Sequence, residues 1–448
     1  MKVVVIDDDP TGSQTVHSCP LLLRWDQDTL RWGLRHPSPL LFLLADTRAL
    51  TPEAAVERNR LIASNLDGAL AQEGLNRRDV LLVSRGDSTL RGHGVMEPAA
   101  LAECFGPFDA TFHVPAFLEG GRTTVDGVHR LHGQPVHETP FARDRLFGFS
   151  SSDLARWLEE KSSGAIPAAA VLRIGWRELD AACGTGLPRL LDRLRGLSGN
   201  VSVVVDAERH AQLDAFAAAV RGLRAEKRFL FRSAASLVKA LADPGPPPLD
   251  AAGLVALRRR GADGRGQPGL VMVGSHVPLA DQQLEHLLQD SSCRGVELPV
   301  QRIARVLDGG TPDLLLADLE REWQGQLQSL LASGATPVLF SSRGELRFGT
   351  EREGRRFSRE LAQLMGRLAA GLASDLGYLI SKGGITTQTL LADGLGLESV
   401  QLEGQLLPGL SLVRRLEGRH AGLPILTFPG NLGNATTLRK AWQGMQAG

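Results

Sequence analysis

Cysteine is scarce and scattered in this sequence. Cys19, Cys104, Cys183 and Cys293 lie about eighty or more residues apart, with no CxxC pair and no cluster with histidine. This spacing indicates neither a disulfide framework nor a zinc site. Long apolar runs are also missing, since none approaches the roughly 18 residues of a membrane span. The opening MKVVVIDDDP is unlike a signal peptide. We therefore expect a cytoplasmic protein with no membrane partner.

Net charge is absent as well, because 50 Lys or Arg residues balance 50 Asp or Glu residues. This balance argues against a protein that coats nucleic acid, so any anionic ligand has to meet local positive charge. Arginine is abundant, at 44 residues against 6 lysines, so a single arginine is weak evidence for a functional site. What the chain does have is a 43% apolar share and 448 residues, which favour two or three packed domains.

Short apolar runs alternate with amphipathic stretches of helical length, such as 52–73 and 207–224. The strands predicted in the first half are 2–6, 40–45, 80–84, 110–114, 171–174, 201–205 and 228–231. Near-continuous apolar strands separated by helices are typical of a parallel sheet that is covered on both faces. The pattern therefore predicts an α/β fold with right-handed crossovers.

A stretch rich in proline and glycine divides the chain. It contains DPGPPPLD at 243–250 and RRRGADGRGQPG at 258–269, a composition typical of a linker or exposed connection. A long surface loop inside one domain is the alternative. Beyond this stretch the alternation of strands and helices restarts. We predict two α/β domains with an interdomain cleft, each a mainly parallel sheet flanked by helices: residues 1–245, a connection at 246–267, and residues 268–448.

Asp7, Asp8 and Asp9 follow the first predicted strand and precede Pro10-Thr11-Gly12. Ligands of open parallel sheets bind beyond the carboxyl ends of the strands. Adjacent carboxylates repel one another, so a divalent cation, arginine partners or solvent should offset them. The same residues match the DxDxT pattern of haloacid-dehalogenase-like phosphatases, with Asp7 as nucleophile and Asp9 as acid. A solvated acidic turn is a further alternative.

The densest group of polar side chains is SRGDSTLRGH at 84–93, directly after a predicted strand. Arg85 and Arg91 can hold a carboxylate or phosphate through bidentate hydrogen bonds. Asp87 can accept a proton from a substrate hydroxyl or hold one of these arginines. Arg48 follows another strand and should reach the same edge of the sheet. The stretch 115–129 either lines the same site or forms a glycine turn that leads into a hairpin.

Glycine-centred turns mark the C-terminal half, at Gly274-Ser275, Gly383-Gly384 and Gly430-Asn431, each between a predicted strand and a helix. Free backbone N–H groups at such turns bind phosphate, so three of them are consistent with a nucleotide pocket. Ordinary strand-to-helix turns also carry glycine. The chain has no GxxxxGK[ST], and its GxGxxG at 264–269 precedes a strand, which argues against P-loop and Rossmann sites.

An arginine-rich acidic site in one domain and phosphate-type turns in the other suit phosphoryl transfer. The segments 7–17, 84–93, 115–129 and 138–149 resemble the N-terminal domain of the four-carbon acid sugar kinases. SKGGITTQTLL at 381–391 and FPGNLG at 428–433 resemble their C-terminal nucleotide-binding domain. The resemblance implies an ATP- and Mg²⁺-dependent kinase acting on a threonate, an erythronate or an oxo-tetronate.

The resemblance also implies roles for individual residues. Substrate binding falls to Asp8, Thr11, Arg48, Arg85, Ser88 and Arg91. Asp9 and Asp87 also belong to this substrate side. For in-line phosphoryl transfer we expect Asp87 or Asp9 as the base, with the backbone N–H groups of Gly383 and Gly384 stabilising the transferring phosphate. Nucleotide binding falls to Ser275, Gly383, Gly384, Thr386, Gly430 and Asn431, whereas metal ligands are not identified. The expected partners are a sugar acid and ATP, with a homodimer left open. The alternatives are the phosphatase and a non-catalytic sugar-acid-binding protein.

Overall fold

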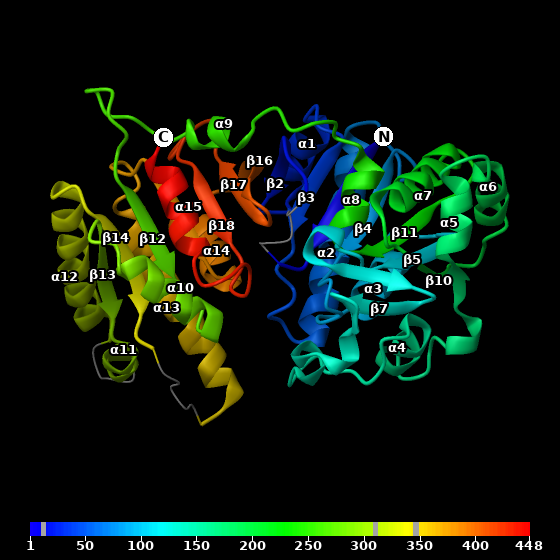
Figure 1. Ribbon diagram of the computed structural model, residues 1–448, viewed down its shortest axis with the longest axis horizontal. Coiled ribbons are helices and arrows are strands. Elements are labelled where there is room, and N and C mark those ends of the chain that lie inside the picture. The colour runs from blue at the N-terminus through cyan, green and yellow to red at the C-terminus, as the bar shows by residue number, and fades with distance from the viewer. Residues whose placement is uncertain (10–14, 308–311, 344–348) are drawn as a thin grey trace. The chain divides into compact units, whose positions relative to one another are not determined.

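The computed structural model describes residues 1–9, 15–307, 312–343 and 349–448. It divides into two compact units, Met1–Pro246 and Pro247–Gly448. Each unit contains a mainly parallel sheet flanked by helices (Figure 1), which confirms the predicted α/β class. Thr11 belongs to the segment 10–14, so this predicted substrate residue lies outside the described residues.

The sheet of the first unit has the strand order β2-β3-β1-β4-β11-β5-β10-β9, with every neighbouring pair parallel. Its strands are β1 (Lys2–Asp7), β2 (Cys19–Leu22), β3 (Leu40–Leu44), β4 (Val80–Arg85), β5 (Ala110–Val114), β9 (Leu172–Ile174), β10 (Val201–Val205) and β11 (Phe229–Ser233). All seven strands predicted in this half are present, and β2 is an addition. The last of them to be synthesised, β11, lies between β4 and β5 (Figure 1).

Helices cover this sheet because each turns an apolar face toward it. They are α1 (Gln27–Arg35), α2 (Pro52–Gln72), α3 (Met96–Phe105), α4 (Leu154–Lys161), α5 (Trp176–Ala182), α6 (Leu187–Arg195), α7 (His210–Gly222) and α8 (Ala235–Ala242). Helix α2 shows how the sequence sets a boundary. Thr51 caps it by accepting a hydrogen bond from the backbone N–H of Ala54, and Pro52 occupies the first turn. Its buried Ile62 and Leu66 belong to the core that contains Val4 of β1.

The segment 115–129 forms a hairpin, one of the two alternatives predicted for it. Its antiparallel sheet consists of β6 (Arg122–Val125), β7 (Val128–Leu131) and β8 (Gln134–Pro135). The imidazole of His129 lies 2.9 Å from Thr124 Oγ1 and 2.7 Å from the carbonyl oxygen of Ser88. The hairpin is therefore bonded to the 84–93 loop.

The sheet of the second unit has the order β13-β14-β12-β15-β18-β17-β16. Its strands are β12 (Gly269–Val273), β13 (Cys293–Leu298), β14 (Thr336–Ser341), β15 (Tyr378–Lys382), β16 (Ser399–Leu407), β17 (Leu410–Arg414) and β18 (Ile425–Phe428). The strands from β13 to β18 pair in parallel, whereas β17 pairs antiparallel with both β16 and β18. This antiparallel addition was not predicted.

The helices of the second unit are α9 (Ala251–Val255), α10 (Pro278–Leu288), α11 (Val300–Leu307), α12 (Pro312–Ala332), α13 (Glu351–Ala370), α14 (Gly384–Thr389) and α15 (Thr437–Gln446). Short 3-10 turns occur at Leu118–Gly120, Val136–Glu138, Pro140–Arg143 and Ala168–Ala170, and a π turn at Leu390–Gly394. Helix α9 lies in the stretch 246–267, and its Leu254 is buried in the core of the second unit. Within the described ranges, no helix is long and apolar enough to cross a membrane.

Candidate functional site

The aspartates after β1 lie against arginines from two other segments. Arg48 donates from Nη2 to Asp8 Oδ1 at 2.7 Å and from Nη1 to Asp9 Oδ2 at 2.6 Å. Arg85, the last residue of β4, donates from Nη1 to Asp7 Oδ1 at 3.1 Å. These side chains meet because β1, β3 and β4 are parallel neighbours whose carboxyl ends share one edge. Arginine partners are therefore what offsets the carboxylates.

Strand β11 adds a third arginine to this group. Arg232 donates from Nη1 to Glu97 Oε2 at 2.6 Å and to Ser84 Oγ at 2.8 Å, and its Nη2 lies 3.9 Å from Asp8 Oδ2. Glu97, in the first turn of α3, also accepts a hydrogen bond from Thr47 Oγ1. We call the connected set the Asp8 network, and its members are Asp7, Asp8, Asp9, Arg48, Arg85, Glu97 and Arg232.

The Asp8 network contains four carboxylates and three guanidinium groups, and the guanidinium groups stay protonated. One negative charge is thus in excess within a buried cluster. Burial raises the pKa of Asp7 to about 7, with Asp8 and Asp9 raising it further and Arg85 opposing them. Burial and the Asp9 charge likewise raise the pKa of Asp46, beside the network, to about 7. The cluster therefore changes its proton content near neutral pH.

In the 84–93 loop, Asp87 holds Arg91 in place. Its Oδ2 accepts hydrogen bonds from Thr89 Oγ1 and Arg91 Nε, both at 2.7 Å, and its Oδ1 accepts the backbone N–H of Thr89 at 3.0 Å. Burial by itself would raise the pKa of Asp87, but Arg48, Arg91 and Thr89 together hold that pKa well below its usual range. Asp87 is therefore ionised at neutral pH. The Arg91 guanidinium also lies 4.9 Å from the centre of the Phe141 ring.

Gly92 allows the backbone of this loop to pass close to the Asp8 network. Its φ of +91° lies in the region that favours glycine, and a Cβ there would lie 2.9 Å from Asp8 Oδ2. On the other side of the loop, Ser88 is buried and its carbonyl oxygen bonds His129. The SRGDSTLRGH segment is thus held at its middle by the Ser88 contact and near its C-terminal end by Gly92.

A pocket opens beside this loop in the first unit. It is lined by Gly86, Asp87, Leu90, Arg91, Gly94, His113, Pro115, Leu154, Trp157, Arg232 and Ser233. The lining includes the predicted Asp87 and Arg91 together with side chains from β5, β11 and α4. His113 and Arg232 are partners in the register of β5 and β11, so they lie next to each other across the sheet.

In the second unit, the glycine-centred turns after β12, β15 and β18 lie side by side. The backbone N–H of Gly383 donates to Phe428 O at 2.9 Å, and the N–H of Gly274 donates to Lys382 O at 3.1 Å. A Cβ at Gly430 would lie 2.6 Å from Ser275 Oγ, and one at Gly383 would lie 3.3 Å from the Ser275 nitrogen. Glycine therefore allows these turns to approach one another closely.

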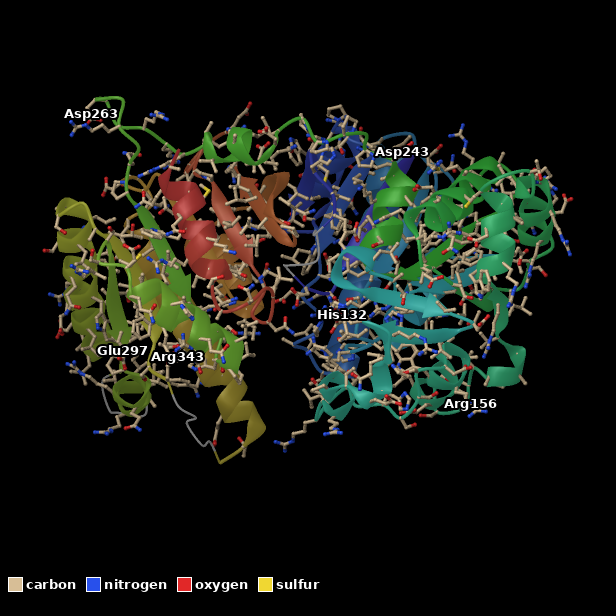
Figure 2. The ribbon with its side chains drawn as sticks, in the orientation of Figure 1. His132, Arg156, Asp243, Asp263, Glu297 and Arg343 are labelled. Carbon is tan, nitrogen blue, oxygen red and sulfur yellow. The ribbon has the colours of Figure 1, made fainter. Side chains whose placement is uncertain are left out.

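Lys382 is buried beneath these turns. Its Nζ donates to the carbonyl oxygens of Pro429 and Gly430, both at 3.1 Å, and lies 4.0 Å from the centre of the Phe428 ring. Burial, with a smaller effect of Arg343, lowers the pKa of Lys382 to about 7. Arg343, labelled in Figure 2, donates to the Ser275 carbonyl oxygen at 2.6 Å.

The structure brings most of the predicted residues into two groups. The first unit gathers Asp8, Asp9, Arg48, Arg85, Asp87, Ser88 and Arg91. The second gathers Ser275, Gly383, Gly384, Thr386 and Gly430, with the exposed Asn431 on the same turn as Gly430.

The sequence analysis missed Arg232, His113, Glu97 and Trp157. Arg232 and His113 are the ionisable residues of two fully buried strands, FLFRS and ATFHV. A polar side chain in such a strand is the signal that would have found them, because burying it requires a partner. Glu97 and Trp157 lie on helices and carry no comparable signal.

The described residues do not fit a metal site held by the protein alone. Among them, no group of three or more His, Cys, Asp and Glu side chains is arranged to hold an ion. The most acidic segment, Asp7 to Asp9, is bonded to Arg48 and Arg85.

The chain thus combines two α/β units, one with a buried arginine–carboxylate network and one with adjoining glycine turns. Residues 3–241 match the family model described as a sugar-binding N-terminal domain, and residues 270–438 match a nucleotide-binding C-terminal domain. The chain belongs to the four-carbon acid sugar kinase family.

Curated relatives match over nearly the whole chain. The D-erythronate kinase of Heliobacterium modesticaldum is 27% identical over 461 residues, covering 97% of this chain and 94% of that protein. The D-threonate kinase of Cupriavidus necator is 29% identical over 413 residues, covering 89% of this chain and 86% of that protein.

Two solved structures share the fold. Haemophilus influenzae protein HI1011 superposes with a TM-score of 0.64 at 16% identity, over 99% of this chain and 100% of that chain. A Salmonella typhimurium LT2 protein described as a proposed tRNA synthase superposes with a TM-score of 0.67 at 17% identity, over 98% of each chain. At these identities the likeness concerns the fold alone.

Proposed function

We propose that this protein is an ATP-dependent kinase that phosphorylates a hydroxyl group of a four-carbon sugar acid, of the threonate, erythronate or oxo-tetronate type. The observation that carries the proposal is the Asp8 network with its neighbouring Arg91, because Asp8, Arg48 and Arg85 lie together within the matched sugar-binding domain. The names of the D-erythronate and D-threonate kinase relatives support this substrate class.

Arg91 is our candidate for the ligand of the substrate carboxylate. Its Nε is bonded to Asp87 and Thr89, while its two Nη groups have no hydrogen-bond partner within the described part of the chain. It also lines the pocket. Arg48 and Arg85 are engaged by aspartates, so their contribution is positive charge at the site rather than free donors. Asp8, Thr11 and Ser88 complete the proposed substrate side.

For the general base we favour Asp9 over Asp87. A base needs a pKa near the working pH, and the hydrogen bonds and charges around Asp87 hold its pKa far below that range. The Asp9 carboxylate is 18% exposed and lies at the end of β1, where a ligand can meet it. In this proposal Asp9 takes the proton of the attacking hydroxyl, and Asp87 keeps Arg91 oriented.

The nucleotide side is proposed to consist of the three glycine turns. The backbone N–H groups of Gly383 and Gly384, with Ser275, Thr386, Gly430 and Asn431, would bind the phosphates of ATP. Backbone donors aimed at developing charge typically lower a barrier by about 3–4 kcal/mol each. Lys382 would act through the turn that it holds, because both its hydrogen bonds go to carbonyl oxygens of that turn. No step is assigned to a metal ion, since the described residues do not form a metal site by themselves.

The test is ATP consumption by the purified protein with magnesium and a panel of C4 to C6 sugar acids. Stimulation by a four-carbon acid is the expected result. No stimulation by any acid would refute the kinase. Hydrolysis of a sugar-acid phosphate without nucleotide would favour the phosphatase, and acid binding without turnover would favour the binding protein. Sedimentation of the same sample measures whether the protein is a homodimer.

A further inference from the structure

The pocket beside Arg91 contains polar atoms that the fold leaves without partners. His113, on β5, is 4% exposed, and neither of its ring nitrogens has a hydrogen-bond partner in the described part of the chain. Trp157, on α4, is also 4% exposed, and its indole Nε1 lacks a partner there too. Both residues line the pocket. Buried donors and acceptors without partners cost free energy, so their presence in one cavity points to a ligand.

The chemistry of these atoms selects the ligand group. Burial, with the Arg232 charge beside it, lowers the pKa of His113 to about 3, so the imidazole is neutral. A neutral imidazole offers one donor and one acceptor, and an indole offers one donor. A hydroxyl group can both donate and accept, so it satisfies such a set, whereas a carboxylate cannot donate to the imidazole. Leu90, Pro115 and Leu154 provide apolar wall for C–H groups.

Two glycines bring the flanking side chains close to the loop. A Cβ at Gly94 would lie 2.5 Å from Trp157 Cη2, so the indole packs directly on the backbone there. A Cβ at Gly86 would collide with the Arg232 guanidinium. Arg232 itself is held by Glu97 and Ser84. The charged groups of the pocket are therefore paired or assigned to the carboxylate, which leaves His113 and Trp157 for an uncharged part of the ligand.

We propose that His113 and Trp157 bind a hydroxyl group of the sugar acid and determine which hydroxylation pattern the enzyme accepts. This inference rests on the proposed function. The acid would lie with its carboxylate on Arg91 and a hydroxyl between the imidazole and the indole. His113 on β5 lies beside Arg232 on β11 in the register of the two strands, and Arg232 is already bonded to Glu97 and Ser84.

The test compares hydroxylated and deoxygenated acids on the full chain. The substrates are the best four-carbon acid of the panel and its 2-deoxy and 3-deoxy analogues, with magnesium and ATP. Trp157→Phe keeps the ring and removes the N–H, and His113→Leu removes both ring nitrogens. His113→Gln retains one donor and one acceptor. Trp32→Phe, on the exposed face of α1, is the matched control.

We expect kcat/KM for the hydroxylated acid to fall about 3- to 10-fold in Trp157→Phe and at least as much in His113→Leu. His113→Gln should recover part of the loss. For the analogue that lacks the contacted hydroxyl, kcat/KM should differ little between these variants and the wild type. The KM for ATP should stay constant in all of them. Equal losses on hydroxylated and deoxy acids would overturn the inference, as would no loss on either.

Calorimetric titration of the acid without nucleotide separates the two failures. If the protein consumes no ATP but binds the acid, and binding weakens in both pocket variants, the kinase proposal is overturned and the hydroxyl site stands. If the protein consumes ATP but the variants lose the same factor in kcat/KM on hydroxylated and deoxy acids, the kinase proposal stands and the hydroxyl site is overturned. If the wild-type chain neither binds nor turns over any acid, both are overturned.

Discussion

Removal of Arg232 should destabilise the first unit strongly, and the structure allows the size to be worked out. Arg232→Met takes away the cation bonded to Glu97 at 2.6 Å and lying 3.9 Å from Asp8, whereas both carboxylates remain buried. Breaking a buried pair in this way typically costs about 3–5 kcal/mol, because an uncompensated charge is left behind. In a unit of about 246 residues, each kcal/mol lost from the free energy of unfolding lowers Tm by about 2–4 °C. The expected fall in Tm is therefore about 6–20 °C.

The assay is thermal unfolding of the full chain, followed by hydrogen exchange in peptides that cover β4 and β11, so that the first unit is observed separately. Arg195→Met is the matched control, because it breaks an ion pair with Glu226 of similar length, 2.7 Å, whose side chains are 46% and 48% exposed. Such a pair contributes about 1 kcal/mol or less.

A double variant completes the test. Arg232→Met with Glu97→Met removes both charges, so its loss of stability should be smaller than the sum of the two single losses by at least about 2 kcal/mol. Equal shifts for Arg232→Met and Arg195→Met, or additive losses in the double variant, would refute the reasoning.

Three further predictions concern the site. Asp9→Asn should lower kcat at least 100-fold with little change in the KM for the acid, whereas Asp87→Asn should mainly raise that KM; steady-state kinetics that show the reverse would exchange their roles. The raised pKa of Asp7 means that the folded state holds a proton which the unfolded chain releases between about pH 4 and 7. The stability of the wild type relative to Asp7→Asn should therefore fall as pH rises across that window, and urea melts that differ by a constant amount would contradict this. Gly92→Ala should cost about 1–3 kcal/mol more than Gly74→Ala, since both have positive φ but only Gly92 has a neighbour within 4 Å; equal melting points would show that the loop tolerates the methyl group.

Apolar patterning predicted most of the parallel strands because they are buried on both faces. Val80–Arg85 and Ala110–Val114, for example, have every residue buried. The missed strand β2 is fully buried too, but it has only four residues and contains Pro20. Cys293–Leu298 alternates buried and exposed residues and contains Arg294 and Gly295, so it has no continuous apolar run. The antiparallel pair β16 and β17 depends on a hairpin whose pairing no strand–helix alternation indicates.

The site was predictable where polar residues are adjacent in sequence and less so where the sheet brings them together. The 84–93 segment and the aspartates after β1 are visible as compact motifs. Arg232 lies 148 residues from Ser84, and only the register of β11 beside β4 makes them partners. No local pattern contains that register, so a polar residue in each strand can mark Arg232 and His113 but cannot show that they join the Asp8 network and the pocket.

The position of β11 has a consequence for how the protein is made. This strand separates β4 from β5 in the sheet, yet it is synthesised long after both of them. Until residues 229–233 emerge from the ribosome, β4 and β5 each present an unpaired edge, which is a template for wrong pairing. Closing so distant a contact is also slow. A nascent chain that stops short of β11 would therefore have a divided sheet and would lack Arg232 and Ser233 of the pocket lining. This interval is where we expect the chain to need a chaperone most.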